Sequence, residues 1–179
     1  DMDKAVQAIE EAVDNEVKIT VYGDYDCDGV TSTVMLYTHL DAIGANVQWY
    51  IPTREEGYGL NENAIRKLHD DGTGLIITVD NGVSAVNEAE LIYELGMKLV
   101  ITDHHQLPEI LPRAEAIVNP HRRDDTSPYK ELAGCGVALK LIMALERDAD
   151  GVLEQYADLA AIGTIGDVVP LTGENRVIV

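Results

Sequence analysis

Three groups of polar residues in this chain have the types and spacing of metal ligands. They are Asp24, Asp26 and Asp28 in a glycine-bounded segment, then Asp80-Asn81-Gly82, and then Asp103-His104-His105. A single Asp commonly caps a helix or forms a turn, and that is the simplest explanation for any one of them. Several carboxylates at one place repel each other strongly unless cations neutralise them. Taken together, the three groups indicate a site for metal ions.

The ligand types narrow the choice of metal. Mixed aspartate and histidine ligands favour Mn²⁺, Mg²⁺ or Fe²⁺ over the thiolate-rich sites of structural zinc, and Cys27 and Cys135 match no zinc spacing. Residues 24–29 also lack the frame and terminal Glu of an EF-hand calcium loop. With this many ligands we expect a pair of ions, and paired ions hydrolyse phosphate esters.

Asp167 is a further candidate ligand. It follows the apolar stretch from Ala157 to Ile165 and is a lone charge among apolar residues, where an unpaired carboxylate would be costly. A metal ion would remove that cost, and by itself a helix cap or a buried hydrogen bond explains the residue equally well.

The elements that position these residues alternate along the chain. We expect helices at 3–14, 31–43, 61–70, 84–95, 137–146 and 153–162, and strands at 17–22, 46–51, 75–79, 98–102 and 116–118. Apolar strands separated by helices predict an α/β fold, doubly wound, with a mainly parallel sheet and helices on both faces. Ligands bind such sheets beyond the carboxyl ends of the strands, which is where all three groups fall.

Composition limits the function classes. The chain has 179 residues, 13 basic and 32 acidic, for a net charge of −19, and 46% of its residues are hydrophobic, which excludes a disordered or collagen-like chain. The sequence contains no apolar run long enough to predict a membrane span, so we expect a soluble cytoplasmic protein. A chain this acidic attracts no phosphate backbone as a whole. It would have to contact nucleic acid through metal ions, local basic residues or further domains.

Four motifs in order resemble those of the DHH phosphoesterase superfamily: Asp24–Gly29, Asp80–Gly82, Asp103–His105 and Gly166-Asp167. Finer features, namely Val21–Asp26, Glu56–Gly59, Val118–Pro120 and Gly166–Leu171, resemble its RecJ branch of bacterial single-strand-specific exonucleases. The resemblance covers essentially the whole chain. It implies a DHH catalytic domain over residues 1–179, excised from a longer protein with a DHHA1-type and an oligonucleotide-binding domain.

The resemblance also implies roles for the site residues. The implied metal ligands are Asp26, Asp28, Asp80, His104 and Asp167, with Asp24 as a further candidate. His105 would contact the phosphate or stabilise the transition state, and Asp103 would orient a histidine; with Asp80 they form the implied catalytic group. Many members carry His where this chain has Tyr22, so the first ion has one ligand fewer here or Asp24 substitutes for it.

Substrate contacts are predicted outside the acidic motifs. Arg54 could bind a phosphate and Tyr58 could stack on a base, whereas His121 and Arg122 belong to a basic cluster that an ordinary solvated loop explains equally well. Gly134 and Gly136 stand where a helix would begin, so its free N–H groups could receive a phosphate, and tight packing is the alternative reason for them.

The function that the resemblance implies is 5′→3′ exonuclease digestion of single-stranded DNA to 5′-mononucleotides, in recombination and repair. The expected cofactor is a pair of Mn²⁺ ions, with Mg²⁺ as the alternative, and a single-strand-binding protein or a helicase would be a partner of the full-length protein. A second hypothesis keeps the metal site but assigns small substrates such as oligoribonucleotides, phosphoadenosine phosphate, cyclic dinucleotides or pyrophosphate. A third is an inactive DHH-fold module that binds nucleic acid or a partner protein.

Overall fold

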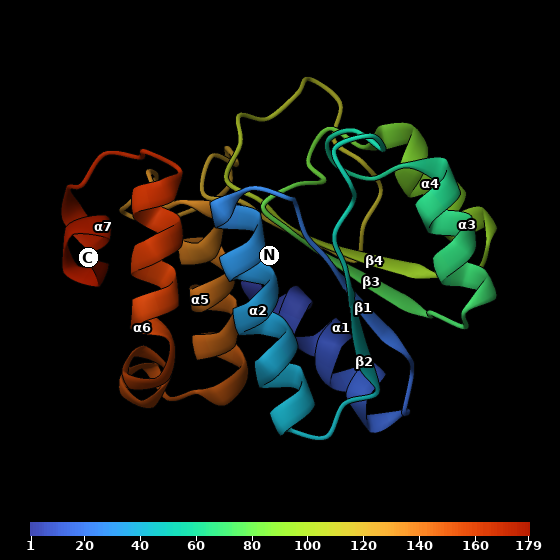
Figure 1. The fold of residues 1–179 in the computed structure, drawn as a ribbon, viewed down its shortest axis with the longest axis horizontal. Coiled ribbons are helices and arrows are strands. Elements are labelled where there is room, and N and C mark those ends of the chain that lie inside the picture. Colours follow the sequence, from blue (N-terminus) through green and yellow to red (C-terminus); the bar gives the residue numbers. More distant parts are fainter.

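Five parallel strands form one sheet in the order β2-β1-β3-β4-β5 (Figure 1). The computed structural model describes all 179 residues. The strands are β1 (Ile19–Tyr22), β2 (Val47–Tyr50), β3 (Leu75–Val79), β4 (Lys98–Thr102) and β5 (Ala116–Val118). The helices are α1 (Met2–Asp14), α2 (Cys27–Ala42), α3 (Glu62–Asp70), α4 (Val86–Glu94), α5 (Gly134–Glu146), α6 (Ala149–Gly166) and α7 (Gly173–Ile178).

Helices cover both faces of the sheet, as predicted. Successive side chains of a strand point to opposite faces, so Ile77 of β3 packs with α1, α2 and α5, while Ile76 packs with α3 and α4. Figure 1 shows α3 and α4 on one side of the sheet and α5, α6 and α7 on the other. Both apolar clusters are buried, which explains why the strands are apolar at nearly every position.

The strand order places a crevice at one edge of the sheet. From β1 the chain runs first to β2 on one side and then to β3 on the other, so the order reverses between β1 and β3. In open α/β sheets, ligands bind at this switch point, beyond the carboxyl ends of the strands. Asp24 follows β1 there and Asp80 follows β3.

Several helix boundaries differ from the predicted ones, and one helix was not predicted. α2 begins at Cys27 because the Asp26 side chain accepts a hydrogen bond from Gly29 N and caps the helix. α6 begins at Ala149 because Asp148 caps it in the same way. The short helix α7 was not predicted, since its six residues are too few to show a helical period.

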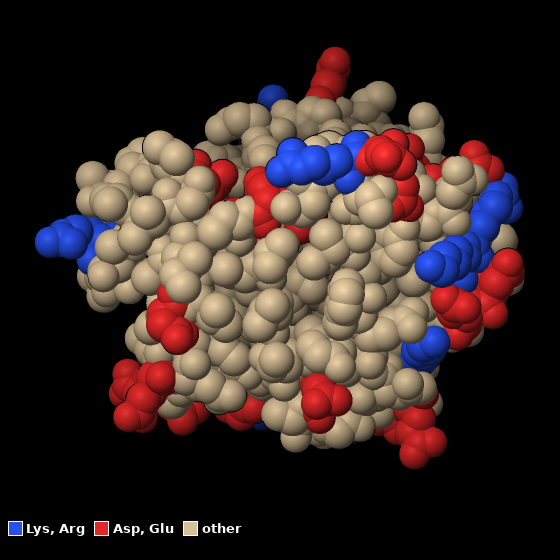
Figure 2. All heavy atoms as spheres, viewed as in Figure 1, with Lys and Arg blue, Asp and Glu red and all other residues tan.

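Charged side chains avoid the centre of the face shown in Figure 2, over α2. Large apolar side chains are exposed instead, among them Val34 of α2, Ile165 of α6 and Trp49 of the edge strand β2. None of the helices is long and apolar enough to cross a membrane.

Candidate metal centre

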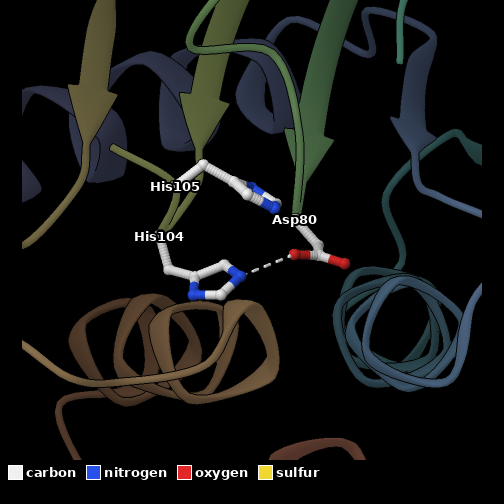
Figure 3. A group of neighbouring side chains, drawn as sticks. All are labelled: Asp80, His104 and His105. Carbon is white, nitrogen blue, oxygen red and sulfur yellow. Dashed lines mark ion pairs between the residues drawn. The ribbon is translucent and has the colours of Figure 1, made fainter. Parts of the chain in front are cut away.

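Asp80 is the central residue of the site. It follows β3 in the left-handed backbone region, with φ of 62°, a conformation that Asp and Asn tolerate better than most residues. Its side chain is buried, and Oδ1 has no hydrogen-bond partner. The His104 ring, at the end of β4, points toward it with Nε2 3.2 Å from Oδ1 (Figure 3). An ion between these atoms would bind both.

His104 Nε2 is surrounded by carboxylates. Besides Asp80, it lies 3.5 Å from Asp167 Oδ2 and 3.8 Å from Asp28 Oδ2. Three overlapping groups have ligand atoms within 4.8 Å of one another: Asp24, Asp26 and Asp80; Asp28, His104 and Asp167; and Asp80, His104 and His105. The structure thus brings together every metal ligand predicted from the sequence.

Asp28 is held by the beginning of α5. Its carboxylate oxygens accept hydrogen bonds from Gly134 N at 2.6 Å and Cys135 N at 2.8 Å. The partial positive charge of a helix N-terminus favours such an anion. Asp28 therefore occupies the Gly134 N–H group that was predicted to receive a substrate phosphate, whereas a phosphate contact of Gly136 stays a prediction.

The two glycines of α5 are explained by packing instead. A Cβ atom on Gly134 would lie 2.6 Å from the Asp80 carboxylate, and one on Gly136 would touch the Leu132 side chain at 3.0 Å. Only glycine at 134 lets α5 approach Asp80 this closely.

Gly166 of the fourth motif, and Gly163, which was not selected from the sequence, bring Asp167 into place. A Cβ on Gly163 would lie 2.3 Å from Thr31 Oγ1, and one on Gly166 would lie 2.8 Å from Cys27. These glycines let α6 pack closely against α2, so that Asp167, its C-cap, reaches the site. The position of Gly163 three residues before Gly166 is the signal that could have identified it.

Burial and mutual repulsion raise the pKa of three acids of the site, Asp24, Asp80 and Asp167. Burial, together with the charges of Asp28 and Asp26, raises the pKa of Asp80 to about 10. Burial also raises the pKa of Asp24 and of Asp167. The site is therefore an unfavourable place for several negative charges unless cations are bound.

The buried polar atoms fit a divalent ion. Asp24 Oδ1, Asp80 Oδ1 and His104 Nε2 are all buried and have no hydrogen-bond partner, which normally costs free energy. Oxygen and imidazole donors without thiolates suit Mn²⁺ or Mg²⁺.

Asp103 fixes the orientation of His105. Its Oδ1 accepts hydrogen bonds from His105 Nδ1 at 2.7 Å and from His105 N, and Oδ2 accepts one from Val83 N. Burial alone would raise the pKa of Asp103, but the hydrogen bonds from His105 and Val83 lower it below its usual value. The hydrogen bond to Asp103 in turn raises the pKa of His105.

The predicted substrate contacts have different surroundings. Arg54 is exposed and stacks over the Tyr25 ring, with its guanidinium carbon 4.8 Å from the ring centroid. The Tyr58 hydroxyl contacts both the Asp80 carbonyl and His105. His121 N donates a hydrogen bond to Asn119 Oδ1, and the Asn119 amide donates one to the His105 carbonyl.

Arg122 is not a free cation. Its guanidinium pairs with Asp1 and Asp124, at 2.6 Å in each case, so two carboxylates already compensate its charge. The prediction that Arg122 contacts substrate phosphate is therefore not supported by the structure, and its partners explain why. Asp1 is remote in the sequence, so only the fold could show this pairing.

Comparison with known proteins gives a family and its relatives. A family model described as the DHH family, N-terminal domain, matches residues 18–164. The single-stranded-DNA-specific exonuclease RecJ of Bacillus subtilis strain 168 is 51% identical over 99% of this chain and 22% of the relative. RecJ of Escherichia coli K12 is 40% identical over 99% of this chain and 33% of the relative. The chain thus spans a third or less of the length of these curated relatives.

Two solved structures of RecJ are similar to this chain in both fold and sequence. A crystal structure of exonuclease RecJ bound to manganese superposes with a TM-score of 0.89 and 39% identity, covering 99% of this chain and 46% of the other. RecJ of Thermus thermophilus in complex with Mn²⁺ gives a TM-score of 0.83 and 36% identity, covering 99% of this chain and 26% of the other.

Proposed function

Because the chain belongs to the DHH family, we propose that it hydrolyses single-stranded DNA as a 5′→3′ exonuclease and releases 5′-mononucleotides in recombination and repair. The observation that carries the proposal is the cluster at the ends of β1, β3 and β4, where buried oxygen and nitrogen atoms have no hydrogen-bond partner. The names of the relatives support the substrate, and the manganese in two similar structures supports the cofactor.

The metal ions would be held by side chains from separate segments of the chain. These are Asp24, Asp26, Asp28, Asp80, His104 and Asp167. Bound Mn²⁺, or Mg²⁺ in its place, would lower the pKa of a water molecule and neutralise phosphate charge.

His105 is the residue that would contact the scissile phosphate. Its Nδ1 is engaged by Asp103, which leaves Nε2 as the ring nitrogen available to a substrate. The side chain is 45% exposed, so a phosphate can reach it. Asp103 favours the protonated ring, which can donate a hydrogen bond to a phosphate oxygen and stabilise negative charge there.

Arg54, Tyr58 and His121 would guide the strand toward the metal ions. Arg54 is an exposed cation near Asp24, and Tyr58 and His121 are linked to His105 directly or through Asn119. The direction of digestion, the cytoplasmic location and a single-strand-binding protein or helicase as partner also belong to this proposal.

Digestion of a 5′-phosphorylated, single-stranded oligonucleotide with Mn²⁺, labelled at either end, tests the proposal. The wild type is compared with Asp80→Asn, and with Asp70→Asn at the exposed end of α3 as a matched control. We expect 5′-mononucleotides from the wild type and the control, and at least about 100-fold slower digestion by Asp80→Asn. Turnover of pyrophosphate or a small nucleotide without DNA cleavage would instead support the second hypothesis. DNA binding without any cleavage would support the inactive module.

A further inference from the structure

Tyr22 forms hydrogen bonds to the loop that precedes α3 and contains Gly59 and Asn61. Its side chain is completely buried, and its hydroxyl donates a hydrogen bond to the Gly59 carbonyl at 3.0 Å. The same oxygen accepts a hydrogen bond from the Asn61 side chain at 3.2 Å. The Tyr22 hydroxyl therefore holds the backbone of the loop.

The loop turns Tyr58 toward the metal centre. Gly57 and Gly59 flank Tyr58 and have φ of 90° and 79°, in a region that glycine adopts without steric cost. The Tyr58 hydroxyl lies 3.1 Å from the Asp80 carbonyl and 3.3 Å from His105 Nδ1. The Tyr58 and His105 rings meet edge to face, with centroids 5.8 Å apart.

One placement of the protons satisfies all these contacts. The Asp103 carboxylate can only accept, so His105 Nδ1 carries a hydrogen. The Tyr58 hydroxyl donates to the Asp80 carbonyl, and its oxygen is a second acceptor for Nδ1–H. Tyr58 thus contacts the residue with the left-handed backbone at the centre of the metal site and the residue that would face the phosphate.

We propose that Tyr22 and Tyr58 form a tyrosine brace, a pair of positioning residues that hold Asp80 and His105 in the arrangement needed for metal binding and hydrolysis. Tyr58 acts through its hydroxyl, and Tyr22 acts through the loop that carries Tyr58. This role differs from stacking on a base, which needs the aromatic ring and not the hydroxyl. The effect of the brace on Mn²⁺ binding does not depend on the proposed function, whereas its effect on the rate of hydrolysis rests on that function.

Calorimetric titration with Mn²⁺ tests the brace without substrate. The variants are Tyr58→Phe, Tyr22→Phe and their combination, with Tyr93→Phe as the matched control, because the Tyr93 hydroxyl binds only Glu115, away from the site. We expect the Mn²⁺ dissociation constant to rise about tenfold in Tyr58→Phe and less in Tyr22→Phe. The double variant should equal Tyr58→Phe, since both changes act through one hydroxyl. Unchanged affinity in Tyr58→Phe would overturn the brace.

Kinetics on a single-stranded oligonucleotide separate positioning from stacking. We expect Tyr58→Phe to lower kcat about tenfold and to leave KM within about twofold. A raised KM with unchanged kcat would overturn the brace in favour of a substrate contact. Tyr58 is 51% exposed, so losing its hydroxyl does not endanger folding even if Tyr22→Phe does. If the wild type cleaves no DNA, the proposed function fails, and the Mn²⁺ titration still decides on the brace.

Discussion

Asp80 combines features that are each unfavourable without a ligand. Its backbone is left-handed, its carboxyl group is buried, and its pKa is raised to about 10 by burial and neighbouring carboxylates. Strained, desolvated residues of this kind persist where the surrounding structure holds them for function. Here the surrounding structure includes Gly134, which leaves room for the carboxylate, and Tyr58, which binds the carbonyl.

Gly134→Ala should therefore damage the metal site. Its methyl group would lie 2.6 Å from the Asp80 carboxylate, which must move away from the ligand position. We expect the Mn²⁺ dissociation constant to rise at least about tenfold by calorimetry. Gly136→Ala is the matched control, because the atoms nearest to its methyl group belong to the Leu132 side chain and not to the metal centre, and it should change the affinity less than about twofold. Equal affinities in the two variants would contradict the packing argument.

The sequence predicts which residues gather at the metal centre, but it does not predict the contacts that position each of them. Asp80 and His104 could be placed because both follow apolar strands, whose ends share an edge of the sheet. The hydrogen bonds from α5 to Asp28 and the pairing of Arg122 with Asp1 join segments more than 100 residues apart. Nothing local in the sequence signals such contacts, which depend on the packing of whole helices.

At the scale of elements, strands were easier to predict than helix ends. β3 and β4 have the predicted bounds because their apolar runs are sharply bordered by polar residues and glycine. α2 and α5 begin earlier than predicted because their first turns carry residues that the site requires, Asp28 and Gly134, instead of an apolar stripe. At the beginnings of these helices, residues of the site replace the apolar positions from which a helical period could be recognised.

The packing of α2 on α5 predicts a pH dependence of stability. His39 of α2 is buried 3.6 Å from Glu146 of α5, and burial lowers its pKa below 6.5 although Glu146 partly offsets this. Above pH 6.5 the His39 ring is neutral in both the folded and the unfolded chain, so its burial does not lower the free energy of unfolding through protonation. As the pH falls from 6.5 toward the lower folded pKa, the unfolded chain binds a proton that the folded chain does not, so stability is lost.

Urea unfolding of the metal-free protein at about pH 7.5 and about pH 5.5 measures this effect. Comparison with His39→Gln cancels the contribution of the acidic cluster, because both proteins contain it. We expect the wild type to lose more free energy of unfolding than His39→Gln between the two pH values. Parallel losses in the two proteins would show that His39 contributes nothing.

The whole molecule carries a net charge of −19, which opposes binding of a DNA backbone. Its basic side chains are few, and in the view of Figure 2 they lie mostly near the border of the molecule, next to acidic ones. Divalent ions at the metal centre would supply positive charge at the one place where the proposed chemistry needs it. DNA cleavage by this chain would therefore depend on metal binding more than on any other feature.

Anomalous diffraction at the manganese absorption edge, from crystals grown with Mn²⁺, tests this dependence most directly. We predict two peaks about 3.5–4 Å apart, one beside Asp24 and Asp26 and the other beside Asp28, His104 and Asp167, with Asp80 between them. Crystals of Asp80→Asn should lose at least one peak. An absence of manganese at this cluster in the wild type, or manganese bound only elsewhere, would contradict the account.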